Sequence, residues 1–268
     1  MASTSKPRTT GAAKEVKPKK KDLPADLVRE FRSLFDEAKK ATDSANRQIA
    51  SAKWGVYAFY DYDGEPIYVG QTKESLATRL NRHLTNQRTD AVAMRILDVF
   101  EVAELEVWPI WALEGTPKKG EDLDAYKAAQ TVLDAHEYSA YLKAIENSKF
   151  GAILNEKIPP VSNPIELPES HRFALVSKQT RAERDHPDVR IARRAETLAR
   201  LAAVAHERGE VSAGLRRVLV IQAVRLAFKA AERFNYAEGE PAPNPEAISV
   251  EGLIGSVLYP TDDEGAGD

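Results

Sequence analysis

The sequence of 268 residues contains no cysteine. This absence excludes disulfide bonds, thiolate metal sites and a cysteine nucleophile, so any chemistry must use oxygen and nitrogen groups. Long apolar runs are also lacking, because none approaches the ~18–20 residues of a membrane span. The chain begins with Met1 and a polar stretch, without the apolar core of a secretory signal. We therefore expect a cytoplasmic protein that does not enter a membrane.

Several common functional motifs are missing as well. No G-x-S-x-G element supports a serine hydrolase, and no glycine-rich loop of the P-loop type is present to hold a nucleoside triphosphate. His136 is followed by Glu137, but no H-E-x-x-H pattern continues from them. Neither a zinc finger nor a recognisable helix-turn-helix is found. These absences argue against a serine hydrolase, a P-loop nucleotide-binding protein, a zinc metalloprotease, a zinc-finger protein and a helix-turn-helix protein.

Charge is distributed unevenly along the chain, although the net charge is only −3. Residues 1–21 carry seven Lys and Arg side chains against one Glu. We expect residues 1–22 to be a disordered basic arm that either lies along phosphates or serves only for solubility. Residues 237–268 carry eight acidic residues and no Lys or Arg. This end is expected to be an acidic, partly disordered tail.

Hydrophobic periodicity predicts a mixed α/β (α+β) chain with a small three-stranded sheet flanked by helices, followed by a helical C-terminal region. An amphipathic helix is expected within 23–50, and a Pro-rich linker over 161–177 precedes two helices in 178–236. Between them lies a domain at 51–160. Its expected elements are strands at 54–60, 66–69 and 105–113 and helices at 74–84 and 122–147.

The informative segment is W-G-V-Y-A-F-Y-D-Y-D-G-E-P-I-Y-V-G, residues 54–70. Asp63-Gly64 between two β-rich runs predicts a hairpin, which can bring Tyr57 and Tyr68 to one end of the sheet. Arg79 and His83 are four residues apart, so on a helix they share one face. We expect this face to point away from the leucines at 76, 80 and 84. A guanidinium beside an imidazole suits phosphate binding and proton transfer.

The triplet Gly55-Val56-Tyr57, ten further residues and then Tyr68-Val69-Gly70 resemble the paired signature of the GIY-YIG nuclease family. The resemblance extends over about 54–160, because Arg79, His83, a later helical carboxylate and Asn155 follow in the family's order. Each residue alone has an ordinary structural explanation, such as a core tyrosine or a surface arginine. The ordered set favours a nuclease site.

The resemblance implies a role for each position. Tyr57 would be the general base or would orient the attacking water with help from His83, and Tyr68 would bond the scissile phosphate or its water. Arg79 would stabilise the developing negative charge, and Asn155 would support the site from behind. Gly55 and Gly70 are the structural glycines of the two triplets.

The family's single metal carboxylate has two candidates here. Glu137 lies 18 residues before Asn155, inside an amphipathic helix pattern, whereas Glu146 lies nine residues before it at the expected end of that helix. We prefer Glu137 and keep Glu146 as the alternative. The implied cofactor is Mg²⁺ or Mn²⁺, since Mg²⁺ needs only one or two protein carboxylates and keeps several waters.

The implied function is metal-dependent endonucleolytic hydrolysis of DNA in a restriction-like or genome-maintenance role, close to the nucleoid in a prokaryote. Two alternatives are a catalytically inactive nucleic-acid-binding module and a purely structural interaction protein. Additional DNA contacts are expected from two basic stretches, Lys19, Lys20, Lys21, Arg193 and Arg194. For the arginine-rich stretch, a solvated helix face is an equally weighted alternative. The C-terminal helices offer a surface for a second copy or another protein.

Overall fold

The computed structural model describes residues 26–84 and 96–259. The predicted basic arm and its Lys19, Lys20 and Lys21 lie outside the described residues. The helices are α1 (Asp26–Ala38), α2 (Leu76–Leu84), α4 (Leu123–Asn147), α5 (Lys178–Arg184), α6 (Pro187–Arg208), α7 (Ala213–Glu238) and α8 (Val250–Ile254). The strands are β1 (Gly55–Tyr60), β2 (Pro66–Thr72), β3 (Glu104–Pro109) and β4 (His171–Ala174). Short 3₁₀ helices lie at Ile49–Ser51, Val99–Glu101, Trp111–Leu113 and Pro245–Ala247.

The mixed α/β fold with a helical C-terminal region is as predicted, but the sheet has four strands and not three. All its neighbours are antiparallel, in the order β2-β1-β3-β4. The additional strand, β4, comes from within the expected linker and pairs with β3, with Leu105 opposite Phe173. It is short, and its side chains alternate between partly buried and exposed. Proline-rich sequence on one side and a strand of only four residues explain why periodicity did not reveal it.

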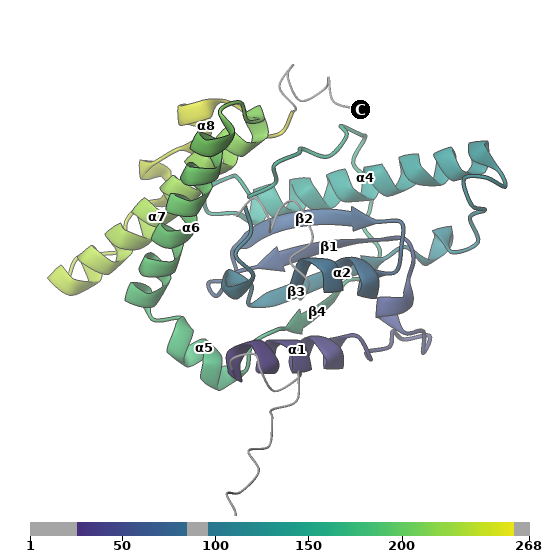
Figure 1. Ribbon diagram of the computed structural model, residues 1–268, viewed down its shortest axis with the longest axis horizontal. Coiled ribbons are helices and arrows are strands. Elements are labelled where there is room, and N and C mark those ends of the chain that lie inside the picture. The colour runs from purple at the N-terminus through teal and green to yellow at the C-terminus, as the bar shows by residue number, and fades with distance from the viewer. Residues whose placement is uncertain (1–25, 85–95, 260–268) are drawn as a thin grey trace, which may run out of the picture.

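Alternation along β1 sends side chains to two cores. Val56 and Ala58 face a cluster that contains Leu133 and Tyr141 of α4. Tyr57 and Phe59 face the other cluster, with the leucines of α2 at positions 76, 80 and 84. Figure 1 shows α2 in front of the sheet and α4 running along β2. The edge strand β2 therefore lies between two helices that cover opposite faces.

The C-terminal helices pack against the same core. Buried residues of α6 and α7, among them Leu201, Val218 and Ile221, join the cluster of β1 and α2. The region contains three helices from α5 to α7, one more than predicted. The join between α6 and α7 is at Gly209, where φ is +71°, whereas Gly214 lies inside α7.

A buried ionic cluster fastens these helices to the hairpin. Oδ2 of Asp61, which lies directly after β1, is 3.0 Å from Arg190, 2.7 Å from Arg194 and 2.9 Å from Arg225. Asp61 and all three arginines are buried. A buried charge is costly unless it is paired, so each partner fixes the position of the others. These contacts tie α6 and α7 to the turn between β1 and β2.

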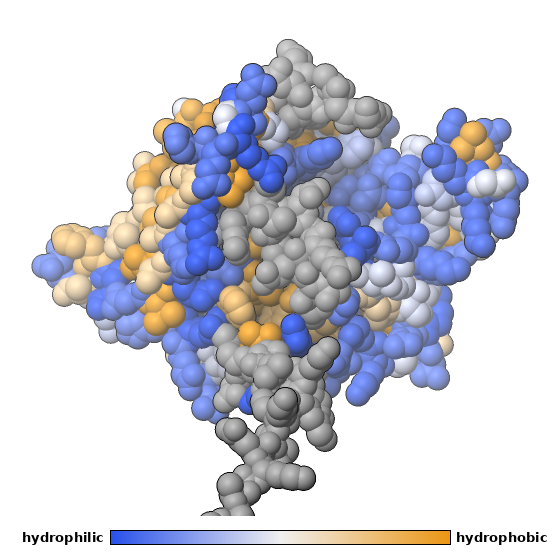
Figure 2. All heavy atoms as spheres, in the orientation of Figure 1, coloured by the Kyte–Doolittle hydropathy of each residue, from blue (hydrophilic) through white to orange (hydrophobic). Residues whose placement is uncertain are grey.

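No helix of the described residues has the combination of length and apolar character that a membrane span requires. Apolar colour is visible over α6 and α7 at the left of Figure 2. Phe234 and Tyr236, near the end of α7, are exposed. The expected partner surface on these helices stays a prediction.

Candidate active site

The two tyrosines of the triplets lie on one face of the hairpin. Tyr57 pairs with Gly70 across the strands, and Phe59 pairs with Tyr68, so both phenol rings are on the α2 side. Their ring centroids are 6.3 Å apart in a stacked arrangement. Tyr57 is completely buried, whereas Tyr68 is partly exposed. Tyr68 is thus the phenol nearer to solvent.

Gly70 is required by the tyrosine opposite it. A Cβ atom at this position would lie 2.6 Å from the hydroxyl oxygen of Tyr57 and 2.8 Å from its Cζ. These separations are shorter than any normal contact, so only glycine leaves room for this phenol. At Gly55 a Cβ would be 3.1 Å from Leu76, a tighter contact than usual but one with a flexible side chain.

Helix α2 supplies two groups to the Tyr57 hydroxyl. Arg79 Nε donates to it at 3.1 Å, and the hydroxyl is 2.8 Å from Nε2 of His83. Arg79 can only donate, so the tyrosine oxygen accepts from it, and the hydroxyl donates to His83 in the tautomer whose Nε2 carries no proton. His83 is buried beside the leucine stripe of α2, and so the expectation that it points away from this stripe was wrong.

Protonation states follow from burial and from neighbouring charges. Burial raises the pKa of Tyr57 well above 10, Tyr68 adds to this shift, and Arg79 opposes it without cancelling it. Burial also raises the pKa of Tyr68, to about 12. Burial lowers the pKa of His83 to about 3, with further lowering by the charges of Arg79 and Arg82. At neutral pH the free site therefore holds neutral phenols and a neutral imidazole.

Arg79 is the cation of this group. Burial opposes its charge, but Tyr57, Tyr68 and Glu137 outweigh burial and raise its pKa. The guanidinium therefore stays charged when it is partly withdrawn from water, which is the state that binds a phosphate most strongly.

Glu137 reaches the site from α4, on the other side of the edge strand. Its burial raises its pKa to about 8, and the charge of Asp134 adds to the shift. Hydrogen bonding with Gln71 and the charge of Arg79 act in the opposite direction. The carboxyl hydrogen-bonds with Gln71, the residue after Gly70, and its charge influences the pKa values of Arg79, Tyr57 and Tyr68. Glu146, the alternative, is exposed at the end of α4.

Sequence reasoning missed the polar residues around Glu137. Gln71 Nε2 and Gln130 Nε2 both donate to Oδ1 of Asp134 at 2.8 Å, and Lys73 donates to Gln130 at 2.6 Å. Two signals were available. Gln71 directly follows Gly70, and Asp134 precedes Glu137 by three residues, a spacing that puts both carboxylates on one helix face.

The donor set near Glu137 fits a divalent cation. Two carboxyl groups of one helix face lie together, and Oε1 of Gln71 is buried without a hydrogen-bond partner in the described part of the chain. Oxygen donors of these types are the ligands that Mg²⁺ and Mn²⁺ prefer. No group of three or more His, Asp or Glu side chains suited to a metal occurs within 26–84 and 96–259. A cation here would have few protein ligands and would keep several waters.

Asn155 lies behind β2 and bonds its backbone. Its Oδ1 accepts from the amide of Val69 at 3.0 Å, and its Nδ2 donates to the carbonyl of Val69 at 2.8 Å. The side chain is buried and extends the hydrogen-bonding edge of the strand between Tyr68 and Gly70. Asn155 thus holds the second triplet without facing the reacting groups.

Two predicted DNA contacts have other partners. Arg194 is buried, and its guanidinium donates to Asp61 and to the carbonyl of Arg225. A contact with DNA does not fit this position, because the side chain has no free path to the surface. Arg193 pairs with Asp98 at 2.6 Å and lies over the ring of Phe100.

Comparison with known proteins agrees with the geometry at the hairpin and α2. Residues 53–121 match a family model described as the GIY-YIG catalytic domain. The match contains both triplets, Arg79 and His83, and it ends before Glu137 and Asn155. No curated protein matches this chain, and no solved structure matches it. The predicted resemblance to the GIY-YIG family is therefore confirmed as a match to the catalytic-domain model over residues 53–121.

Proposed function

We propose that this protein is a divalent-metal-dependent endonuclease that hydrolyses phosphodiester bonds of DNA. GIY-YIG domains are nuclease domains, and that general class comes with the family match. The observation that supports the specific proposal is the meeting of Tyr57 with Arg79 and His83 at one hydroxyl, with Glu137 of α4 hydrogen-bonded to Gln71 beside the second triplet. Hydrolysis of a phosphodiester needs an activated water and compensation of the negative charge that grows on the phosphate, which a proton acceptor, a guanidinium and a carboxylate-bound cation can supply.

Arg79 binds a non-bridging oxygen of the scissile phosphate and stabilises the negative charge that grows there. A donor aimed at such a charge is typically worth about 10²–10³ in rate. Tyr68, the partly exposed phenol, donates to the phosphate or to the attacking water. Because burial keeps the pKa of Tyr68 at about 12, it acts here as a hydrogen-bond donor and not as a base.

Tyr57 and His83 accept the proton of the attacking water. As the water oxygen bonds to phosphorus, the water proton passes to the hydroxyl of Tyr57. The bond to the leaving oxygen breaks, and this oxygen takes a proton from solvent water. The proton of the Tyr57 hydroxyl moves to Nε2 of His83, which lies 2.8 Å away. In the free protein the charge of Arg79 lowers the pKa of His83. A phosphate bound to Arg79 offsets that charge, so substrate binding raises the proton affinity of the acceptor.

Glu137 would hold the metal ion, with Asp134 and the free oxygen of Gln71 beside it. When bound there, the ion supplies Lewis-acid stabilisation of the phosphate and lowers the pKa of a bound water. Glu137 must lose its proton to bind a cation, and its pKa of about 8 makes this step pH-dependent.

Cleavage of supercoiled plasmid in Mg²⁺ or Mn²⁺ tests the proposal. Glu137→Gln is expected to lose at least about 100-fold in rate, because the ion then lacks its carboxylate ligand. Glu146→Gln is the matched control, since it makes the same change on the same helix, and it is expected to cut like the wild type. If Glu137→Gln cuts at the wild-type rate, or if only Glu146→Gln is inactive, the assignment of Glu137 is wrong.

A further inference from the structure

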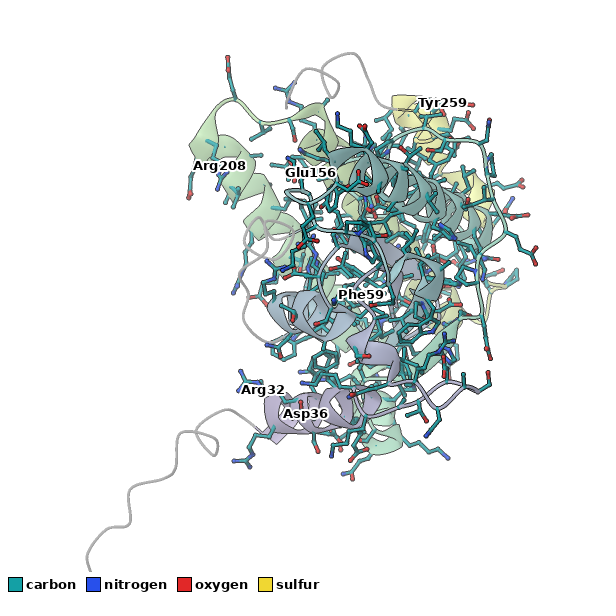
Figure 3. All side chains as sticks on the ribbon, turned by 90° about the vertical axis from the view of Figure 1, so that its right-hand side faces the viewer. Arg32, Asp36, Phe59, Glu156, Arg208 and Tyr259 are labelled. Carbon is teal, nitrogen blue, oxygen red and sulfur yellow. The ribbon has the colours of Figure 1, made fainter. Side chains whose placement is uncertain are left out.

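The first turn of α7 lies directly on the segment that contains Asn155. Gly214 packs so closely that a Cβ there would be 1.9 Å from the carbonyl oxygen of Glu156. Ser212, which caps α7, donates to the Glu156 carboxylate at 2.8 Å. Figure 3, in which Glu156 is labelled, shows this residue next to the teal helix α4. The contact between Gly214 and Glu156 joins residues 58 positions apart in a region that sequence patterns treat as separate.

Arg217 completes this contact. Its Nη2 donates to the carbonyl of Glu156 at 2.7 Å and to the carbonyl of Asn155 at 3.2 Å. The side chain is only 8% exposed. A guanidinium that bonds two successive carbonyl groups in a buried place fixes the path of the backbone there, because leaving these groups unpaired costs free energy.

The backbone at Asn155 and Glu156 is connected to the reacting groups through two successive contacts. Asn155 holds the amide and the carbonyl of Val69 with its side chain. Val69 stands between Tyr68 and Gly70, and Gly70 lies against the Tyr57 hydroxyl. A shift of Asn155 would therefore move both tyrosines relative to Arg79.

The same helix also holds the other end of β2. Arg225, two turns after Arg217, donates to the carbonyl of Pro66 at 3.3 Å and to Asp61 at 2.9 Å. Lys229 pairs with Asp63 at 2.9 Å in the hairpin turn. Helix α7 thus contacts the hairpin at its turn, at the start of β2 and, through Asn155, at the second triplet.

We infer that α7 is a structural part of the nuclease site, and that Arg217 is a positioning residue that sets the second triplet through Asn155. This inference rests on the proposed function only for its effect on cleavage. The contacts also predict that residues 51–160 without α7 lack a correctly positioned site. The helix is then a supporting element of catalysis.

The test compares full-length Arg217→Met with Arg216→Met. Arg216 is exposed on the same turn of α7 and undergoes the same change of charge and size, so it is a matched control. Arg217→Met is expected to lower kcat by about 10- to 100-fold, the loss of one or two charged hydrogen bonds, with KM within a few-fold. Arg217→Lys keeps one donor and is expected to recover part of the rate. Equal kcat values for the two methionine variants would overturn the inference.

Hydrogen exchange of the Val69 amide provides a second measurement that does not need cleavage. Arg217→Met is expected to accelerate this exchange at least about tenfold relative to wild type and Arg216→Met, because Asn155 holds the amide less firmly. Unchanged exchange would refute the positioning role even if cleavage fell. If Arg217→Met exchanges faster but the wild-type protein cuts no DNA, the proposed function is refuted and the structural link remains intact.

Discussion

The contact between Gly70 and Tyr57 gives the sharpest quantitative prediction. In Gly70→Ala the new Cβ would be 2.6 Å from the Tyr57 hydroxyl, whereas ordinary contacts begin at 3.4 Å. The phenol or the strand must therefore move by about 0.8 Å. The Tyr57 hydroxyl is also bonded to His83 at 2.8 Å and to Arg79 at 3.1 Å, and both bonds must stretch or break. A displacement of about 1 Å at a reacting group can cost about 100-fold in rate.

Plasmid cleavage and thermal unfolding, measured on the same protein samples, test this. We expect Gly70→Ala to lose about 100-fold in kcat and about 1–3 kcal/mol in the free energy of unfolding, the usual cost of overpacking a core. Gly115→Ala is the control, because a Cβ there meets no atom within 4 Å. Wild-type kcat in a folded Gly70→Ala protein would refute the reasoning, since the tyrosine would then not need its present position.

Three further predictions concern charge. The unfolded chain releases the Glu137 proton near pH 4.5 and the folded protein near pH 8. Rising pH in this range therefore destabilises the metal-free wild type. Glu137→Gln should have the higher melting temperature at pH 8, and the difference should close toward pH 5. The pKa of His83 is about 6.5 in the unfolded chain and about 3 in the folded protein. The free energy of unfolding of the wild type should therefore fall by up to about 1.4 kcal/mol per pH unit below pH 6.5, and that of His83→Gln should fall less. Asp134→Asn should weaken Mn²⁺ binding about tenfold at pH 9 in an electron paramagnetic resonance titration, whereas Asp124→Asn, an exposed change on the same helix, should not. Equal melting temperatures at pH 8, equal acid sensitivity or equal Mn²⁺ affinity would contradict the respective prediction.

The sequence contained enough local information for the hairpin and its helices. Short apolar runs rich in β-branched and aromatic residues, with the Asp63-Gly64 turn between them, predicted β1 and β2, and the spacing of leucines predicted α2 within two residues of its start. These are properties of short segments, whose burial pattern follows from backbone period alone. The meeting of Tyr57, Arg79 and His83 was implied by the family resemblance and not by these patterns, which placed His83 on the wrong side of α2.

The remaining features depend on contacts between distant residues. Arg194 belongs to an arginine-rich run that is typical of a solvated helix face, and only the folded protein shows that Asp61, 133 positions earlier, draws it inside. The strand β4 is stabilised by β3 and not by its own pattern. Arg217 carries no motif, and its role depends on the path of the backbone at Glu156. No spacing rule reports such pairings, because each is fixed by tertiary packing.

The central claim is that Tyr57, Arg79 and Glu137 together catalyse attack of water on a DNA phosphate. Its most direct measurement is cleavage of plasmid DNA in ¹⁸O-labelled water with Mg²⁺ or Mn²⁺. The claim predicts one labelled oxygen in the new phosphate end of each cut strand, and loss of this product in Arg79→Gln. DNA that is bound but remains uncut with either ion would contradict it and would indicate a binding module in place of an enzyme.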